Sequence, residues 1–199
     1  MDEKKLEILE RATAVYMKYG IKSVTMDDLA KELCISKKTI YKYFSDKNDL
    51  IEAIIQLKIE MDKAICLNCQ QQSINAVDDL IQISRLVVEQ IGSVNPTVFY
   101  DLNRFHKSAW DLLTNHKWGF VLNIISENIN RGIKEGLYRS DLNVDVCSRL
   151  YVSATETILN GEIFPWPEYK FDSVLPDMVS FHLHGMVNEK GRKYLLEHI

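Results

Sequence analysis

The chain has 199 residues, of which 46% are hydrophobic and 26% are charged, with 8 glycines and 4 prolines. These values are typical of a globular protein with its own core, and they exclude collagen-like and low-complexity chains. No apolar run approaches the roughly 18 residues that a membrane span needs, and the charged start of the chain is unlike a signal peptide. We therefore expect a cytoplasmic protein that has no membrane partner.

The net charge of −4 is distributed unevenly along the chain. The first 50 residues carry 10 basic and 9 acidic side chains, whereas the rest carries 14 basic and 19 acidic ones. Residues 37–47 include four lysines and only one acidic residue, Asp46. A charge cluster is usually a solvated surface, but in a suitable fold it binds nucleic acid. The overall acidity therefore does not exclude a DNA partner.

The N-terminal quarter of the chain predicts several helices in close succession. Apolar residues recur with the helical period up to Tyr19, and Gly20 follows where a left-handed C-terminal cap is expected. Thr25 and Ser36 each stand where a hydroxyl can cap the first turn of a short helix. A long fourth helix is predicted to begin at residues 45–47, and it joins the N-terminal part to the rest without a flexible linker.

The remainder of the chain predicts further helices and no strands. Their expected positions are the segment after Ser73 up to Gly92, a helix beginning at Pro96, and residues 118–135, 144–160, 173–184 and 188–197. Pro176 is compatible with the helix at 173–184 only in its first turn. The aromatic segment 164–167 is expected to form a loop. Since no stretch shows the alternation of a strand, we predict an all-α fold.

Residues 29–44 have the pattern of a helix-turn-helix. Ala30 is small where the two helices would cross, and Leu33, Ile35 and Ile40 would hold the angle between them. The second helix presents polar and basic side chains outward, namely Lys37, Lys38, Thr39, Tyr41, Lys42 and Tyr43. In a helix-turn-helix the second helix enters the major groove, where such side chains bond phosphates and base edges.

The segment 36–44, SKKTIYKYF, followed by Lys47 and Leu50, resembles the DNA-binding signature of the TetR/AcrR (tetracycline-repressor) family of bacterial transcriptional regulators. The resemblance implies a three-helix DNA-binding domain at residues 1–48 and a helical ligand-binding and dimerisation domain at residues 49–199. It also implies a homodimer that binds a pseudo-palindromic double-stranded DNA operator. The expected function is that of a repressor that a small-molecule effector releases from this operator.

The resemblance assigns roles to individual residues. Thr25, Tyr43 and Lys47 would contact the phosphate backbone. The other DNA-binding residues would lie on the recognition helix, from its cap onward: Ser36, Lys37, Lys38, Thr39, Tyr41 and Lys42. If the four lysines of each protomer all meet phosphates, about eight contacts predict a slope of about −7 for log affinity against log salt concentration.

Cys34 departs from the family pattern. It occupies the turn between the two helices, where the family usually has a glycine because the position often needs a positive φ. A cysteine held in that conformation costs roughly 1 kcal/mol. Cys34 could also sense oxidants if the neighbouring Lys37 and Lys38 stabilised its thiolate, although a plain turn residue is the simpler interpretation.

The C-terminal part offers two further expectations that rest on the resemblance. Aromatic residues gather between positions 99 and 120, where the family has its effector pocket, although aromatics at helical spacing also build ordinary cores. The predicted ligand-binding residues are Phe99, His106, Trp110, Trp118, Tyr151 and Glu156. The helices at 144–160 and 173–184 resemble the two helices that form the dimer interface, and their alternative role is packing within one chain.

Other classes of function have less support in the sequence. Cys66 and Cys69 lie three residues apart, but no second CxxC or close histidine pair completes a metal site, so we expect buried thiols and no metal. There is no phosphate-binding glycine loop, no HExxH and no GxSxG, so we expect neither catalytic residues nor a cofactor. The main alternative is a dimeric small-molecule sensor of the same fold with weak or lost DNA binding, which Cys34 and the net acidity favour.

Overall fold

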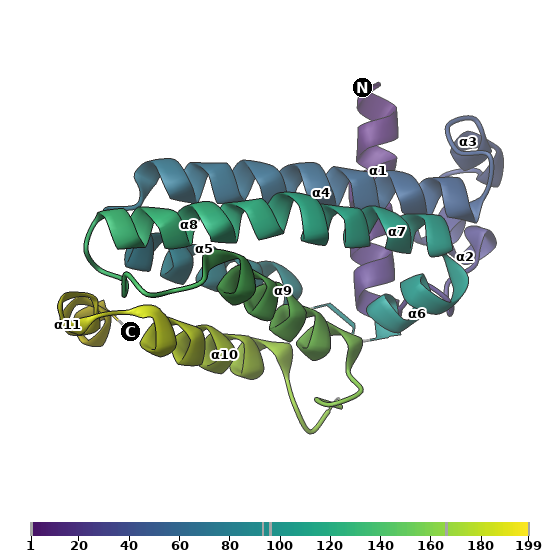
Figure 1. Ribbon diagram of the computed structural model, residues 1–199. Coiled ribbons are helices and arrows are strands. Elements are labelled where there is room, and N and C mark those ends of the chain that lie inside the picture. Colours follow the sequence, from purple (N-terminus) through teal and green to yellow (C-terminus); the bar gives the residue numbers. More distant parts are fainter. Residues whose placement is uncertain (1, 93, 96, 166, 199) are drawn as a thin grey trace. The chain divides into compact units, whose positions relative to one another are not determined.

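The computed structural model describes residues 2–92, 94–95, 97–165 and 167–198 (Figure 1). Its helices are α1 (Glu3–Tyr19), α2 (Met26–Glu32), α3 (Lys37–Tyr41), α4 (Lys47–Gln72), α5 (Ala76–Ile91), α6 (Thr97–Phe105), α7 (Lys107–His116), the π-helical η1 (Lys117–Val121), α8 (Leu122–Lys134), α9 (Val144–Asn160), α10 (Phe171–Met186) and α11 (Glu189–His198). The described residues form no strand beyond one isolated bridge between Tyr138 and Val187. The prediction of an all-α fold is confirmed.

Local capping residues set the ends of the N-terminal helices. Thr25 caps α2 in a reciprocal capping box with Asp28, and the Ser36 hydroxyl caps α3. Gly20 ends α1 with a φ of 84° and donates its amide to the carbonyl of Tyr16. Gly161, with a φ of 73°, ends α9 at the predicted position. The helices end where the sequence predicts, but Gly20, with a ψ of 154°, does not adopt the left-handed helical conformation expected of its cap.

Two predicted helices differ from the structure. The helix expected at 118–135 is the later part of a longer helical run, in which the π-helical turn η1 joins α7 to α8. A π-helical turn differs from an α-helix in its i→i+5 backbone hydrogen bonds, which the pattern of apolar side chains did not predict. The start expected at Pro96 and the loop residue Trp166 lie outside the described residues.

The helix expected at 173–184 begins earlier, at Phe171. The carbonyl of Lys170 accepts hydrogen bonds from the amides of Ser173 and Val174, at 3.1 and 3.0 Å, so the first turn forms before the predicted cap. Pro176 therefore lies inside α10, in its second turn, and the prediction of a first-turn proline was wrong. The missing amide of Pro176 removes one hydrogen bond from the helix.

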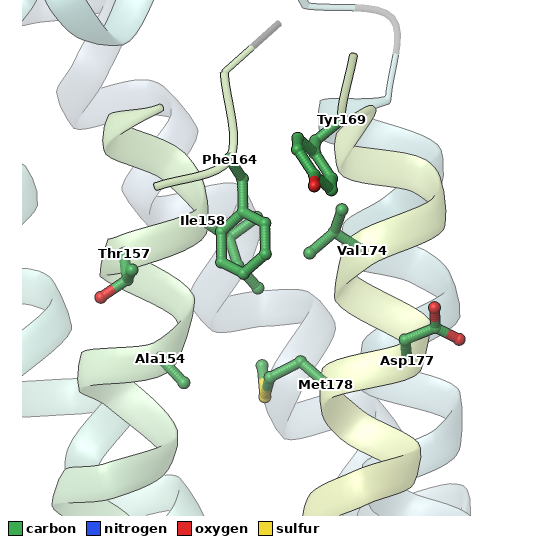
Figure 2. Close-up of a pocket in the computed structure, with 8 residues that line it drawn as sticks. All are labelled: Ala154, Thr157, Ile158, Phe164, Tyr169, Val174, Asp177 and Met178. Atoms are coloured by element: carbon green, nitrogen blue, oxygen red, sulfur yellow. The ribbon is translucent and has the colours of Figure 1, made fainter. Parts of the chain in front are cut away.

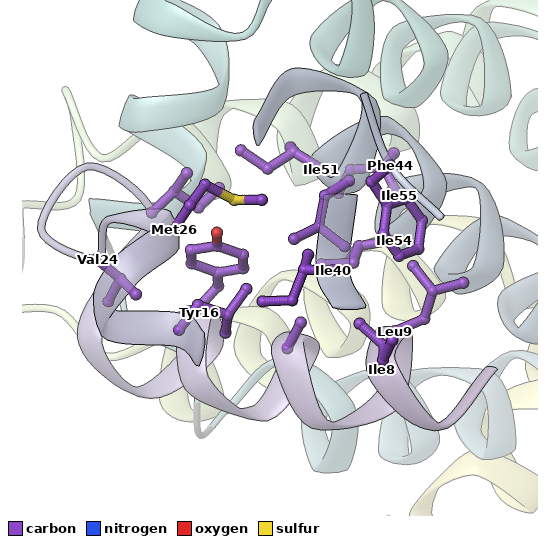
Figure 3. Packing of buried hydrophobic residues seen from close by; sticks show 14 of the residues in the cluster. Ile8, Leu9, Tyr16, Val24, Met26, Ile40, Phe44, Ile51, Ile54 and Ile55 are labelled. Atoms are coloured by element: carbon purple, nitrogen blue, oxygen red, sulfur yellow. The ribbon is translucent and has the colours of Figure 1, made fainter. Parts of the chain in front are cut away.

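The chain packs into two compact units, which we call the first and second unit. The first unit comprises Met1–Met61 and Ser93–Thr114, so α6 and α7 pack with α1–α3 and the first part of α4. Its core is shown in Figure 3, where Tyr16, Ile40 and Phe44 meet residues from the start of α4. The first unit thus includes a segment that is far from the helix-turn-helix in the sequence.

The second unit comprises Asp62–Gly92 and Asn115–Ile199, and its core lies among α5, α8, α9 and α10. Gly132 of α8 passes close to the Tyr138 ring, where a Cβ atom would lie 2.2 Å from a ring carbon. The buried Tyr138 hydroxyl donates toward the Asn128 side chain, at 3.0 Å. No helix within the described ranges is both long enough and apolar enough to span a membrane.

Candidate nucleic-acid interface

The recognition helix α3 is short and is held from both ends. The Ser36 hydroxyl accepts the Thr39 amide at 3.0 Å, which fixes the first turn. Ile40 on the inner face is fully buried, and Phe44 just beyond the helix is buried with it (Figure 3). These two side chains fix which face is inward. Lys37, Lys38, Tyr41 and Lys42 are exposed, and Thr39 is half-buried.

The turn before α3 has the strain that the sequence predicts. Cys34 has a φ of 54° and is the one non-glycine residue with a positive φ in the described part of the chain. The amide of Cys34 bonds to the carbonyl of Lys31 at 3.0 Å, and the amide of Ile35 bonds to the carbonyl of Ala30 at 3.1 Å. This pair of bonds is a Schellman motif, which ends α2 with a left-handed residue. The expectation of a positive φ at Cys34 is confirmed.

The lysines of the recognition helix differ in their surroundings. The ammonium of Lys37 lies 2.9 Å from a carboxylate oxygen of Asp27 on α2, and this hydrogen bond raises the pKa of Lys37. Lys42 lies over the ring of Tyr43, with 5.3 Å between the ammonium and the ring centroid. Lys38 and Lys42 project from the exposed face. They are therefore the two lysines best placed to meet phosphate oxygens.

Lys47, at the start of α4, points its ammonium into the protein. Its Nζ donates to the carbonyls of Ile21 and Val24, both at 2.6 Å. Burial lowers the pKa of Lys47, while the carboxylates of Asp101 and Asp28 favour its charged form. Two of its three N–H groups are thus used inside the protein, so a phosphate contact would have only the third.

Thr25 and Tyr43, the other predicted phosphate contacts, also have structural roles. The Thr25 hydroxyl donates to a carboxylate oxygen of Asp28 at 2.6 Å and accepts the Asp28 amide at 3.2 Å. The Thr25 hydroxyl and the Thr25 backbone amide, which donates to the same carboxylate at 3.1 Å, hold the pKa of Asp28 below its usual range. Tyr43 is partly buried against the core of the first unit. The predicted DNA-binding residues therefore lie on α3 and its flanks, at the N-cap of α2 and at the start of α4, all within the first unit.

The predicted ligand-binding residues are divided between the two units. Phe99, His106 and Trp110 belong to the first unit, where Nδ1 of His106 lies 2.6 Å from the Asn48 side-chain oxygen and Trp110 packs against the core. Burial lowers the pKa of His106, and the nearby charge of Lys47 acts in the same direction. These contacts are those of a packed segment beside α4.

Trp118, Tyr151 and Glu156 belong to the second unit. The Glu156 carboxylate lies 2.8 Å from the ammonium of Lys117, which joins α9 to η1. Tyr151 is buried and meets the His182 ring edge-on, with 5.3 Å between centroids. The role of these residues in binding a ligand stays a prediction.

Two features of the second unit were not anticipated from the sequence. Nε2 of His116 lies 2.6 Å from a carboxylate oxygen of Asp62, and the two residues are far apart in the chain. A groove of about 380 Å³ opens between α9, α10 and the loop that joins them (Figure 2). It is lined by Ala154, Thr157, Ile158, Phe164, Tyr169, Val174, Asp177 and Met178. The aromatic loop was the only sequence signal for this groove.

Cys66 and Cys69 are buried in the second unit, as expected, and burial raises the pKa of Cys66 to about 12. A thiol with a raised pKa is a weak metal ligand and a weak nucleophile. Within the described ranges, no group of three or more His, Cys, Asp or Glu side chains is arranged to hold a metal ion.

Residues 8–54 match the family model described as bacterial regulatory proteins of the tetR family. The chain belongs to the TetR family. The matched segment contains α2, the strained turn, α3 and the start of α4, so it is the same segment whose geometry is that of a helix-turn-helix. This TetR-family chain is a transcriptional regulator.

Relatives of this TetR-family chain extend over most of its length. It is 24% identical over 172 residues to the uncharacterized HTH-type transcriptional regulator YvaF of Bacillus subtilis, covering 84% of this chain and 88% of the relative. It is 21% identical over 156 residues to the HTH-type transcriptional repressor KstR2 of Mycobacterium tuberculosis, covering 75% and 76% of the two chains. A crystal structure from Saccharomonospora viridis, named as a transcriptional regulator in complex with choline, has the same fold, with a TM-score of 0.77, 18% identity and coverage of 95% and 100%.

Proposed function

We propose that this TetR-family regulator is a homodimeric repressor. In this proposal the α3 helices of the two protomers enter successive major grooves of a pseudo-palindromic operator. The observation that carries the proposal is the exposed face of α3, where Lys38 and Lys42 project while Ile40 anchors the helix in the core. The protein would act in the cytoplasm as a binding protein and not as an enzyme.

The proposed dimer forms through α9 and α10. The inner face of α10 is buried, yet its outer face carries Phe181, whose exposed fraction is 81%. The neighbouring α9 exposes Val146 and Leu150. A helix that is apolar on both faces is normally covered on both, and here a second copy would cover the outer face. This arrangement would place two recognition helices in one molecule.

The proposed effector is a small molecule that binds in the C-terminal part, with Trp118, Tyr151 and Glu156 among its contacts. The relative from Saccharomonospora viridis was crystallised with choline, which supports a small-molecule ligand for this fold. Helix α4 contributes Lys47–Met61 to the first unit and its remaining turns to the second, so a change at one end can reach the other. Such coupling is commonly 1–3 kcal/mol, which is roughly 5- to 150-fold in operator affinity.

The second candidate is a dimeric small-molecule sensor with weak DNA binding. The observations that favour it are the strained turn at Cys34, the pairing of Lys37 with Asp27 and the inward position of the Lys47 ammonium. These features leave fewer lysines for phosphates than the sequence alone suggests.

The two candidates are distinguished by fluorescence anisotropy with DNA from beside the gene, in excess competitor DNA. The proposal expects tight, competitor-resistant binding by the wild type and a loss of at least about tenfold in the double variant Lys38→Ala, Lys42→Ala. Lys193→Ala, an exposed lysine on α11 in the second unit, is the matched control and should bind as wild type does. If no DNA is preferred over competitor, including sequences from a random-sequence selection, the sensor interpretation replaces the repressor.

A further inference from the structure

Helix α6 lies along the loop that joins α1 to α2, residues 20–24. The amide of Asn95 bonds to the carbonyl of Met17 at 2.7 Å, just before this loop begins. A Cβ atom at Gly20 would lie 2.6 Å from Oγ1 of Thr97, so only glycine allows this approach. Farther along α6, the Phe105 ring lies beneath the Lys22 ammonium, at 4.7 Å from its centroid. The loop is thus in contact with α6 at Gly20 and at Lys22.

Asp101, in the middle of α6, makes the central contact with this loop. Its Oδ2 accepts the backbone amide of Lys22 at 2.8 Å, and the residue is only 4% exposed. A carboxylate is rarely buried without partners, because burial removes its hydration. The Lys22 amide supplies one partner, and the charge of the nearby Lys47 ammonium supplies a second source of compensation. The buried Asp101 carboxylate therefore serves to hold the Lys22 amide in place.

Lys47 holds the same loop through carbonyl groups of the loop backbone. Its ammonium donates to the carbonyls of Ile21 and Val24, while Asp101 accepts the amide of Lys22 between them. The loop backbone is therefore fixed through both its donors and its acceptors by two side chains of opposite charge. Thr25, the cap of α2, follows Val24 directly.

We propose that Asp101 and Lys47 form a clamp on the 20–24 loop, and that Asp101 is a positioning residue for operator binding. The clamp fixes the position of the first residue of α2. Because the turn at Cys34 sets α3 relative to α2, the clamp also fixes the position of α3. Asp101 touches no DNA in this account, and Lys47 acts on the loop instead of on a phosphate. The proposal rests on the proposed function, since it assumes that α3 reads an operator.

The clamp makes a prediction that a phosphate contact does not. Removing a phosphate contact weakens binding and also makes the salt dependence shallower, by about 2 in slope for one lysine per protomer of a dimer. Loosening the clamp weakens operator binding but leaves the number of phosphate contacts unchanged. Affinity and salt slope therefore separate the two roles of Lys47.

The test compares Asp101→Ala, Asp101→Asn and Lys47→Met with the control Asp111→Asn, an exposed aspartate on α7 that pairs with Lys107. We expect Asp101→Ala and Lys47→Met to raise the operator Kd by about tenfold, with an unchanged salt slope. Asp101→Asn keeps an acceptor for the Lys22 amide but loses the charge facing Lys47, so its Kd should be intermediate. The control should bind as wild type does.

Hydrogen exchange provides a readout that does not depend on DNA. The amide of Lys22 should exchange about tenfold faster in Asp101→Ala than in wild type, while amides in the core of α5 keep their wild-type rates. The proposal is overturned if Asp101→Ala leaves both the Lys22 exchange rate and the operator Kd unchanged, or if Lys47→Met reduces the salt slope by about 2. Where Asp101→Ala does not fold, Asp101→Asn carries the same test, and wild-type behaviour in that variant overturns the clamp.

Failure of the proposed function gives a different pattern. If the wild type binds no operator but Lys22 exchange still rises in Asp101→Ala, the loop is clamped while its purpose is not DNA binding, and the role of Asp101 as a positioning residue for the operator is overturned. If the wild type binds operator DNA and the variants behave as the control does, the proposed function is supported and the clamp is overturned.

Discussion

The ammonium of Lys37 lies 2.9 Å from a carboxylate oxygen of Asp27, so the first lysine of the recognition helix is paired within the helix-turn-helix itself. Both side chains are exposed, and an exposed ion pair contributes little to stability. Its effect on DNA binding is larger in principle, because Asp27 both neutralises Lys37 and adds a negative charge beside the expected phosphates.

Substituting Asp27→Asn should therefore strengthen DNA binding. With Lys37 released, a dimer gains two phosphate contacts, and the salt slope becomes steeper by about 2. Anisotropy titrations over a salt series measure this change. Asp141→Asn, which removes an exposed partner of Arg139 in the second unit, is the control and should leave the slope unchanged. A slope that does not change in Asp27→Asn would show that Lys37 already leaves Asp27 when DNA binds.

The turn residue Cys34 gives a prediction about stability. Replacing it with glycine removes the strain of a positive φ, although the unfolded chain becomes more flexible, so we expect a net gain of about 0.5–1 kcal/mol in the free energy of unfolding. Cys34→Ala keeps a Cβ atom at the same φ and should stay close to the wild type. Urea unfolding followed by circular dichroism measures both variants. Equal stability of the glycine and alanine variants would contradict the strain.

His182 predicts how stability depends on pH. Its ring is packed against Tyr151, and the carbonyl of Cys147 accepts a hydrogen bond from Nε2 at 3.2 Å. Burial lowers the pKa of His182 below 6.5, the ordinary value, despite the opposing effect of this hydrogen bond. The unfolded chain therefore takes up a proton before the folded one does. The contribution of neutral His182 to the free energy of unfolding is complete above about pH 6.5 and is lost as the pH falls through the lowered pKa.

The measurement is the melting temperature of the wild type and of His182→Gln between about pH 7.5 and about pH 5.5. Glutamine can donate to the Cys147 carbonyl but does not titrate in this range. The wild type should lose melting temperature on acidification, and the variant should lose less. Some loss will remain in the variant, because the pKa of His106 is lowered in the same way. Identical curves for the two proteins would exclude His182 as a source of the pH dependence.

The exposed Phe181 predicts the behaviour of the dimer. Truncation of a central aromatic residue in an interface commonly costs about 2 kcal/mol, so Phe181→Ala should raise the dissociation constant of the homodimer by about 30-fold. Ile74→Ala is the matched control, since Ile74 is 80% exposed between α4 and α5 and should have no effect on assembly. Sedimentation equilibrium measures both variants. A dimer that is insensitive to Phe181→Ala would place the interface elsewhere.

The parts of the structure that were predictable from the sequence depend on short-range chemistry. Thr25, Ser36 and Gly20 cap their helices through residues a few positions away, and the turn at Cys34 follows from the two helices that flank it. The exposed face of α3 follows from one buried residue, Ile40. These features identify the helix-turn-helix before any tertiary contact is known.

The parts that were not predictable depend on contacts between distant segments. The inward position of the Lys47 ammonium is set by carbonyls more than twenty residues earlier, and the burial of Asp101 by an amide 79 positions away. No periodicity reveals that α6 and α7 pack with the DNA-binding helices. The position of Pro176 was missed because hydrogen bonds to the Lys170 carbonyl, and not a side-chain cap, decide where α10 begins.

The most direct test of the account is the salt dependence of operator binding by the wild-type protein. With Lys37 paired to Asp27 and Lys47 bonded to carbonyls, Lys38 and Lys42 provide about four phosphate contacts in a dimer, and the slope of log affinity against log salt should be about −4, not about −7. Competitor-resistant binding with that slope would support a regulator that reads DNA through α3. Binding that competitor DNA abolishes at every salt concentration would contradict it.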